Sequence, residues 1–480
     1  MPKKLFFAAV LYCVISLQTG CATPETIPHP DTIPVAIKPL FKDFMGVNGH
    51  VTFRPALHGQ VCRLVRSYHN MDWDANAPGD TLHIPVTVNQ LNWKNDVYGP
   101  WKNAGLETDI CLQFRLFGVG APRYRQLWKG HEQWAYDYGK VMAAYYGPSG
   151  KEQLCTSLEI DNEPGNRFEP ALFQTLFTKM AQGIRQGDPR MKIVTPAVVA
   201  GKGDNYSQGL DDFYGDKQVL PLYDIINLHT YATMEKSATI ENTWHRSFPE
   251  DPSLRYLKVV DEAITWRNQH APGKEVWITE FGYDACTPAA MKQRKDWALK
   301  LNWQGATDLQ QAQYLVRSFL AFAVRDVQRA YLYYYNDEDE ASFHAASGLT
   351  RNFVPKPAFW AVRQLYQMLG EFRFHRVVKQ EVGQLYIYEF EDGKDPQSLV
   401  WVAWSPTGAD TQHKDNYQPH TITTTLDQLP GKPVRITGMA TTDTPAPAVA
   451  WEKSGDNGIR LTIQESPTYI IFKKNKKTLR

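Results

Sequence analysis

A pattern of short apolar segments that alternate with longer amphipathic ones constrains the fold most, because it occurs eight times over about 330 residues. The apolar runs have the length of strands and end in polar residues. The predicted strands are Phe44–Val51, Cys62–Tyr68, Asp109–Phe117, Leu154–Ile160, Ile193–Val199, Asp224–Leu228, Val276–Thr279 and Ala330–Tyr335. Strand followed by helix, eight times over, predicts an α/β fold of the (β/α)8 TIM barrel type.

The helices expected between these strands include Tyr136–Tyr146, Pro170–Arg185, Leu254–Arg267, Leu309–Arg325 and Pro355–Leu369. From about residue 373 the helical period disappears. Segments such as Leu385–Phe390 and Ile459–Ile463 alternate apolar and polar residues, with turn-rich stretches between them. We therefore expect a catalytic barrel over residues 41–372, followed by a small C-terminal β-sandwich over residues 373–480.

The first residues have the pattern of an export signal. Lys3 and Lys4 precede an apolar run from Leu5 to Leu17, which is too short to span a bilayer. Gly20 and Cys21 follow shortly after the run, which predicts a lipoprotein-type signal over residues 1–21 with a lipidated Cys21 and possible membrane attachment. Plain secretion with cleavage near Ala22 is the alternative. Residues 22–40 are rich in Pro and Thr, as in a tether.

Composition excludes some partners. The net charge of +1 gives no electrostatic case for nucleic acid, and aromatic residues at 12% supply flat rings that stack on sugars or fill a core. The spacings of Cys62, Cys111, Cys155 and Cys286 fit no zinc pattern, so these residues are either buried small hydrophobes or disulfide partners. No metal or other cofactor is expected.

Two glutamates stand at the ends of predicted strands. Glu163 follows the fourth strand and precedes Pro164 and Gly165, which end regular structure. Glu280 ends the seventh strand in the same way, before a glycine turn. The carboxyl ends of barrel strands meet at one face, so the two carboxylates are expected to face each other. Such a pair suits cleavage of a glycosidic bond by one acid and one nucleophile, with the pKa of the acid raised.

Other polar residues lie at the same predicted face. Asn162 offers an amide to a sugar hydroxyl, while Arg66 and Tyr231 are expected to orient the nucleophile. Further substrate-binding candidates, each also open to a structural role, are Asn48, His50, His69, Arg115, Trp128, His229 and Tyr335. The loop from Pro122 to Trp134 mixes arginines with aromatic rings, which fits either a solvated loop or a subsite for an acidic or sulfated sugar. The acids at 337–340 are expected to form a solvated loop rather than a calcium site, because their spacing is wrong for one.

Several motifs together resemble clan A of the glycoside hydrolases. They are Asn162-Glu163-Pro164, Thr279-Glu280-Phe281-Gly282, Arg66 on the second strand and His229-Thr230-Tyr231 after the sixth. The barrel with its β-sandwich, and the helix that opens Lys356-Pro357-Ala358-Phe359, are most similar to family 39 and its relatives. The resemblance covers the architecture of about residues 40–475 but only these motifs in sequence. It implies a retaining enzyme with Glu163 as acid/base, Glu280 as nucleophile and Asn162 as the contact of the sugar 2-hydroxyl.

One departure concerns the end of strand eight. Many clan members place a tryptophan there as a sugar platform, whereas this chain has Tyr333-Tyr334-Tyr335-Asn336. The expected function is an exported, periplasmic or cell-surface retaining glycoside hydrolase that acts on a polysaccharide or oligosaccharide. The alternatives are a non-catalytic carbohydrate-binding lipoprotein and a transglycosylase that uses the same residues. The sugar, its linkage and endo or exo action do not follow from these residues.

Overall fold

The structure is a computed structural model. It describes residues 37–51, 54–114, 127–165, 168–234, 245–300, 302–406 and 420–473. The predicted signal, Cys21, most of the tether and Arg115 lie outside these residues. From Lys38 onward the chain forms one compact unit, which is described here by itself.

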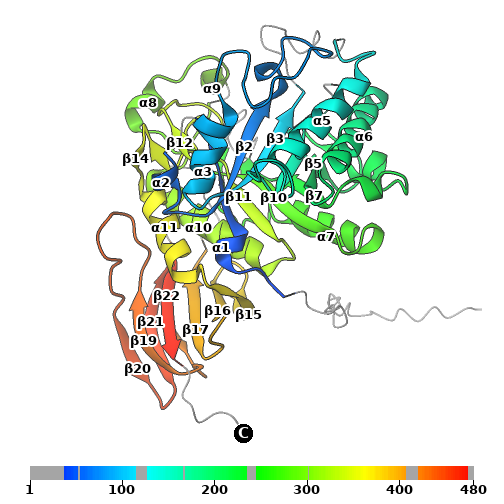
Figure 1. Ribbon diagram of the computed structural model, residues 1–480. Helices are drawn as coiled ribbons and strands as arrows, with labels where there is room; N and C mark the ends of the chain where they lie inside the picture. Colours follow the sequence, from blue (N-terminus) through cyan, green and yellow to red (C-terminus); the bar gives the residue numbers. More distant parts are fainter. Residues whose placement is uncertain are drawn as a thin grey trace, which may run out of the picture. The chain divides into compact units, whose positions relative to one another are not determined.

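Eight parallel strands form a closed barrel (Figure 1). In chain order they are β1 (Met45–Asn48), β2 (Leu64–Asn70), β3 (Glu107–Gln113), β4 (Ser157–Ile160), β5 (Lys192–Val199), β7 (Ile225–His229), β10 (Glu275–Phe281) and β11 (Arg329–Leu332). Neighbours along the chain pair with each other, and β11 pairs with β1 to close the ring. All eight predicted strands are present, within a few residues of their expected bounds. The prediction of a TIM barrel is confirmed.

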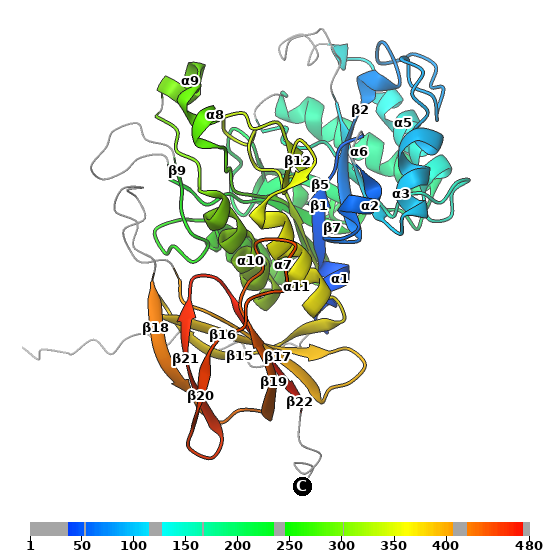
Figure 2. The ribbon, with the colours of Figure 1, turned by 90° about the vertical axis from the view of Figure 1, so that its left-hand side faces the viewer.

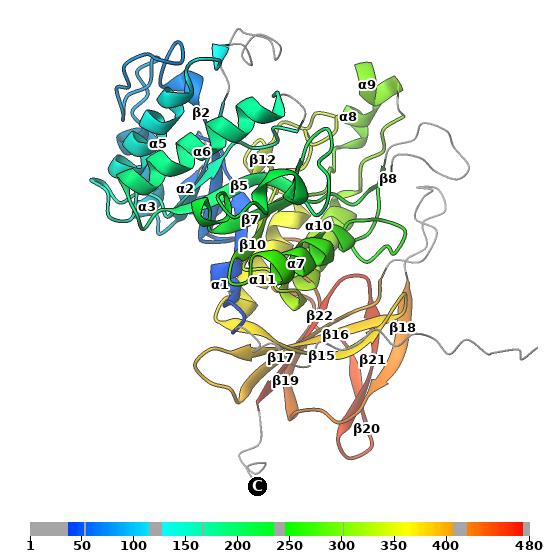
Figure 3. The ribbon, with the colours of Figure 1, turned by 90° about the vertical axis from the view of Figure 1, so that its right-hand side faces the viewer.

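Helices cover the outside of the barrel (Figures 2 and 3). The long ones are α5 (Glu132–Tyr146), α6 (Pro170–Gly187), α7 (Lys258–His270), α10 (Asp308–Val324) and α11 (Pro357–Leu369). α6 buries one apolar face, which holds Leu172, Phe173, Leu176 and Phe177, whereas α10 is buried on all sides from residue 311 to residue 323. The short ones are α1 (Phe41–Phe44), α2 (Pro55–His58), α3 (Gly99–Asn103), α8 (Pro288–Lys292) and α9 (Asp296–Lys300). None of the described helices has the length and hydropathy needed to cross a membrane.

The strand–helix alternation is less regular than the sequence pattern suggests. Between β5 and β7 the chain has a π-helical turn (Leu210–Tyr214) and a 3-10 turn (Leu220–Leu222) in place of an α-helix. Glycine is costly in a helix and aspartate competes for backbone hydrogen bonds, so the stretch that holds Gly201, Gly203 and Asp204 favours turns instead. The remaining helical turns are Met71–Trp73 and Trp93–Tyr98. Small strands are β6 (Gln208–Gly209), β8 (Thr233–Met234), β9 (His245–Arg246), β12 (Asn336–Asp337), β13 (Thr350–Arg351) and β14 (Val354–Pro355).

Two antiparallel sheets follow the barrel, as predicted for the C-terminal β-sandwich. One has the order β15 (Phe372–Glu381), β16 (Leu385–Asp392), β17 (Ser398–Trp404), β22 (Thr468–Lys473), β19 (Lys432–Thr437). The other has the order β18 (Thr421–Leu426), β21 (Gly458–Gln464), β20 (Trp451–Ser454). Leu385, Trp401, Leu461 and Phe472 are among the residues of the core between them. Leu40 forms a bridge to Arg373 at the start of β15, so the chain before the barrel touches this sheet.

A buried ion pair links the barrel helices to the sandwich. Arg317 of α10 bonds both carboxylate oxygens of Glu250, and the indole nitrogen of Trp404 donates to the same carboxylate at 2.7 Å. The Arg317 and Glu250 side chains are 0% and 4% exposed. Isolated charges in such a place are costly, so each charge depends on the other.

Two predictions about single residues are settled by burial. Cys62 and Cys155 are free thiols buried in the apolar core, Cys111 is a buried free thiol beside Glu159, and Cys286 is half-buried. The acidic stretch at 337–340 is not simply solvated, because Asp337 is buried and pairs with Lys356 at 3.1 Å. Arg351 lies 3.1 Å from Asp339 and so neutralises a second of these acids.

Candidate active site

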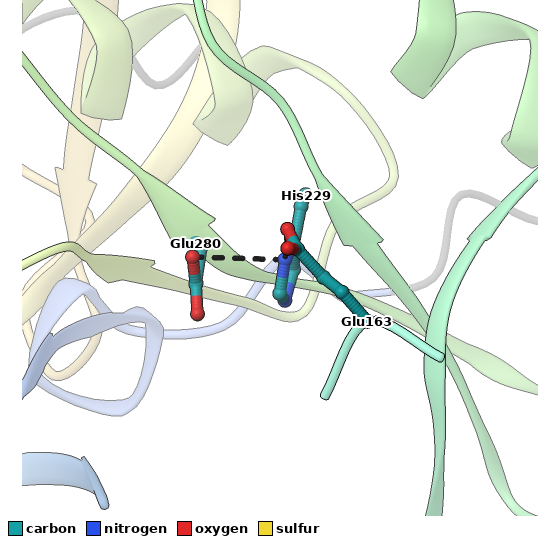
Figure 4. Close-up of side chains that lie close together, drawn as sticks. All are labelled: Glu163, His229 and Glu280. Carbon is teal, nitrogen blue, oxygen red and sulfur yellow. Dashed lines mark hydrogen bonds and ion pairs between the residues drawn. The ribbon is translucent and has the colours of Figure 1, made fainter. Parts of the chain in front are cut away.

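The two predicted glutamates meet at the carboxyl ends of the strands. Glu163 lies three residues beyond β4, and Glu280 is the sixth residue of β10. Figure 4 shows both side chains directed toward His229, the last residue of β7. His229 Nδ1 is 2.8 Å from Glu163 Oε1 and 3.6 Å from Glu280 Oε2. One oxygen of each glutamate and one histidine nitrogen all lie within 4.8 Å of one another.

A tight turn places Glu163. Asp161 has a positive φ of 65°, and its side chain accepts a hydrogen bond from the backbone nitrogen of Asn162. Gly165 also has a positive φ, of 45°, and a Cβ there would lie 2.0 Å from the carbonyl oxygen of Asn205. Glycine is therefore required at this position, and the chain turns shortly after Glu163. The Glu163 side chain is 22% exposed, whereas that of Glu280 is 6% exposed.

Arg66 organises the centre of the site. All five of its N–H groups are used by four side chains on three strands or strand ends. Its Nε and one Nη donate to both oxygens of Glu159 at 2.8 and 2.7 Å. The other bonds go to Glu280 Oε1 at 2.9 Å, and to Asn48 Oδ1 and Asn162 Oδ1 at 2.8 Å each. The guanidinium has no freedom left to rotate, so it fixes these four side chains relative to one another.

Glu280 is held as a carboxylate. Its Oε1 accepts from Arg66 and, at 2.5 Å, from the hydroxyl of Tyr68, while its Oε2 accepts from Tyr231 at 2.8 Å. Burial alone would raise the pKa of this carboxyl. The charges of His229 and Arg66 and the two tyrosine hydrogen bonds outweigh burial and lower the pKa of Glu280 to about 2.

His229 is affected in the opposite direction. Burial would lower the pKa of its imidazole, but the charge of Glu280 and the hydrogen bond to Glu163 raise it above the ordinary value. Two carboxylates and one imidazole so close together are also a set of ligands that a metal ion accepts. A cation would have to displace the proton that lies between His229 and Glu163, next to the positive charge of Arg66, so the group fits acid–base chemistry better.

The structure corrects four predicted substrate contacts. His69, Trp128 and Tyr335 are fully buried and cannot reach a ligand. His69 lies between Tyr98 and Asp74, Trp128 packs on Phe114, and Tyr335 packs near His58. Asn48 is 3% exposed, and its amide nitrogen donates to the carbonyl oxygens of Thr279 and Leu332. It therefore positions Arg66 rather than a sugar.

The remaining predicted residues differ in what the structure says of them. His50 is half-buried, with its ring 4.9 Å from that of Tyr334, and burial lowers its pKa. Arg115 and residues 115–126, which hold the arginines of the Pro122–Trp134 loop, are outside the described residues. Lys129, in the described part of that loop, pairs with Glu169.

Sequence reasoning missed Glu159, Tyr68 and the role of Tyr333. Glu159 stands between Leu158 and Ile160 in a predicted barrel strand, and an acid inside such a strand needs a charged partner, so the sequence did carry a signal. The structure shows that Glu159 is fully buried. Tyr68 lies two residues after Arg66 and so points to the same side of β2. Tyr333 is half-buried, and the charge of Glu280 adds to burial in raising its pKa. The Tyr333 ring lies 6.5 Å from the ring of Tyr68, whose hydroxyl donates to Glu280, so Tyr333 rather than the buried Tyr335 lies beside the site.

Comparison with known proteins gives structural relatives only. No protein-family model and no curated protein matches the sequence. A family 39 glycoside hydrolase from Bacteroides cellulosilyticus superposes with a TM-score of 0.61 at 15% identity, over 91% of this chain and 81% of the other. A monomeric β-xylosidase from Caulobacter crescentus gives 0.56 at 15% identity, over 92% and 96%. A bifunctional glucanase–xylanase from a metagenome library gives 0.59 at 11% identity, over 92% and 97%.

Identities this low show the fold and not the reaction. Both parts of the chain, barrel and β-sandwich, are within the superposed range. The structure is similar to those of clan A glycoside hydrolases, family 39 among them, and the resemblance drawn from the motifs is confirmed at the level of the fold.

Proposed function

We propose that this protein is a retaining glycoside hydrolase that cleaves a polysaccharide or oligosaccharide by double displacement. The observation that carries the proposal is the pair of carboxylates, Glu163 and Glu280, with oxygens within 4.8 Å of each other. Retaining enzymes keep their carboxyl groups roughly 5–5.5 Å apart, whereas inverting enzymes need about 6.5–9.5 Å to admit a water. The similar glycoside hydrolase folds support the same reading.

The hydrogen bonds assign the first chemical step. Glu280 Oε1 already accepts two hydrogen bonds, from Arg66 and Tyr68, whereas Oε2 accepts one, from Tyr231. Oε2 is also the oxygen that lies 3.6 Å from His229 Nδ1, the nitrogen that contacts Glu163. We assign Oε2 as the atom that attacks the anomeric carbon. As that bond forms, the bond from the carbon to the leaving oxygen breaks, and Glu163 gives its proton to the leaving oxygen.

The second step reverses the proton's direction. Once Glu280 is an ester it carries no charge, so the site holds a proton less strongly than before. Glu163 then takes a proton from water while the water oxygen bonds the anomeric carbon and Glu280 Oε2 leaves as carboxylate. Asn162 accepts from Arg66 through Oδ1, which leaves its amide nitrogen to donate to the sugar 2-hydroxyl. Tyr333, beside Glu280, takes the place of the aromatic platform.

Replacement of Glu280 by alanine tests the proposal. Glu280→Ala should abolish release of reducing ends from the wild-type glycan substrate, and azide should restore turnover with a glycosyl azide of inverted configuration. Glu381→Ala is the matched control, since Glu381 is exposed on β15 and should leave turnover unchanged. Wild-type turnover in the Glu280 variant would contradict the assignment. Glycan binding by the wild type without any cleavage would favour a carbohydrate-binding lipoprotein, and longer products would favour a transglycosylase.

We further propose an acidic or sulfated glycan as substrate, supported by the arginines of the Pro122–Trp134 loop. A glycan-library screen that compares sulfated and desulfated forms of each polymer tests this. We also propose export with lipidation of Cys21, which supports a periplasmic or cell-surface location. Incorporation of labelled palmitate that Cys21→Ser abolishes would support the anchor, whereas incorporation that persists in Cys21→Ser would contradict it.

A further inference from the structure

Three polar residues, Asn227, Thr279 and His229, form a hydrogen-bonded row that leads to Glu163. The function proposed above gives no role to Asn227 or Thr279. Asn227 lies two residues before His229 on β7 and is fully buried. Its Oδ1 is 2.6 Å from Thr279 Oγ1 and 3.3 Å from the backbone nitrogen of Thr279 on β10. Thr279 Oγ1 is in turn 3.0 Å from His229 Nε2. The row thus runs Asn227, Thr279, His229 and ends at Glu163.

The direction of each hydrogen bond follows from what each atom is able to donate. The backbone N–H of Thr279 can only donate, so the end of the Asn227 amide that faces it is the oxygen. A carbonyl oxygen carries no proton, so the short contact between Asn227 Oδ1 and Thr279 Oγ1 needs the hydroxyl proton of Thr279. Because Thr279 donates its only hydroxyl proton to Asn227, its oxygen can only accept from His229. His229 Nε2 therefore carries a hydrogen.

This leaves one proton for the other side of the imidazole. The 2.8 Å contact between His229 Nδ1 and Glu163 Oε1 needs a proton between the two atoms. It is held either by the imidazolium, with Glu163 ionised, or by Glu163, with neutral His229 accepting through Nδ1. The opposite neutral tautomer, with its hydrogen on Nδ1, would leave Nε2 facing an oxygen with no proton to offer.

We propose that Asn227 and Thr279 are positioning residues that fix the Nε2–H tautomer of His229, so that the catalytic proton resides in the hydrogen bond between His229 and Glu163. This inference rests on the proposed role of Glu163 as acid/base. The proton given to the leaving oxygen in the first step, and taken from water in the second, then belongs to the pair and not to Glu163 alone.

The charged groups around His229 couple this pair to the reaction. They are Glu163 from the segment after β4, Glu280 from β10 and Arg66 from β2. Ionised Glu280 favours the protonated pair, and Arg66 opposes it. When Glu280 becomes an ester, it no longer attracts the proton of the pair. The positive charge of Arg66 remains and still favours loss of that proton. The pair is thereby ready to act as an acid before the ester forms and as a base after it.

Nitrogen NMR of histidine tests the tautomer on the substrate-free protein. Long-range proton–nitrogen spectra of the full chain with ¹⁵N-labelled histidine distinguish the two neutral tautomers, and His229→Gln identifies the signals. We expect His229 to carry its hydrogen on Nε2 whenever it is neutral. Thr279→Val, which keeps the shape but removes the hydroxyl, should abolish this preference, whereas Thr279→Ser should retain it. Glu163→Gln should lower the pKa of His229 by about one unit or more, because a neighbouring negative charge is lost.

A pH profile of kcat gives the second readout. Without the acceptor at Nε2, the imidazolium is less stable, so Thr279→Val should move the basic limb of the profile to lower pH by about one unit. Thr279→Ser keeps the hydroxyl and should leave that limb in place. If position 279 mattered only for packing, the shift would not depend on whether the hydroxyl is present. Neutral His229 with its hydrogen on Nδ1 in the wild type would overturn the inference, and this result needs no foldable variant at position 279. An unchanged tautomer in Thr279→Val would overturn it as well. The spectra require no turnover, so they separate failure of this inference from failure of the proposed hydrolase activity.

Discussion

Substitution of Glu159 by glutamine removes the charge that neutralises Arg66. Both side chains are 0% exposed, and two hydrogen bonds of 2.7 and 2.8 Å join them. Removal of one partner of a buried ion pair costs about 3–5 kcal/mol, because the other charge is left buried and uncompensated. Arg66 retains Glu280, and glutamine still offers one acceptor, so we expect the free energy of unfolding to fall by about 3 kcal/mol. Arg66 should also shift toward Glu280 and release Asn162, with a loss in kcat of about tenfold or more.

Urea unfolding and turnover on the wild-type glycan substrate measure the two effects separately. Glu250→Gln is the matched control, since Glu250 makes a comparable two-bond pair with buried Arg317 but has no contact with Glu163 or Glu280. The two variants should lose similar stability, and at a temperature where both are folded only Glu159→Gln should lose turnover. The argument for Arg66 as organiser of the site is refuted if the two variants have equal kcat. It is equally refuted if Glu159→Gln unfolds like the wild type.

Three further predictions follow from the same contacts. Tyr68→Phe removes a hydrogen-bond donor from ionised Glu280, and such a bond is worth about 1.5–3 kcal/mol. The pKa of Glu280 should therefore rise above about 2, and the acidic limb of the kcat profile should move to higher pH. An unmoved limb would count against this bond. Because the pKa of Glu280 is lowered on folding, its charge stabilises the protein above about pH 4.3 and loses this effect as the pH falls toward 2. The stability gap between wild type and Glu280→Gln, measured by urea unfolding, should shrink over that interval, and a gap independent of pH would argue against the shift. Trp404→Phe should cost about 1–3 kcal/mol of stability by removing a donor from Glu250, with kcat unchanged at a temperature where the variant is folded.

Much of the barrel was predictable because its determinants are local. Each strand is an apolar run, each long helix has its own apolar stripe, and Pro164 and Gly165 end the chain's regular path after Glu163. The pairing of Glu163 with Glu280 also followed, because parallel strands that close into a barrel bring all their carboxyl ends to one face. The helix expected after β5 failed for a local reason as well, since glycine and aspartate there favour turns.

The roles of individual polar residues were not predictable in the same way. His69, Trp128 and Tyr335 looked like ligand contacts because polar and aromatic residues after strands often are, and only the packing shows them to be buried. Glu159 and Tyr68 lie within strands, where the sequence gives no sign of which charge or hydroxyl they meet across the barrel.

The sequence by itself determined the order of strands and helices, the face on which the site lies and the two glutamates that stand there. Tertiary structure alone decided that Arg66 bonds Glu159, Glu280, Asn48 and Asn162 together, and that the row from Asn227 to His229 orients one proton. The physical reason is range. Periodicity and turn chemistry act over a few residues, whereas hydrogen-bond direction and pKa depend on atoms within a few ångströms that come from strands far apart in the chain.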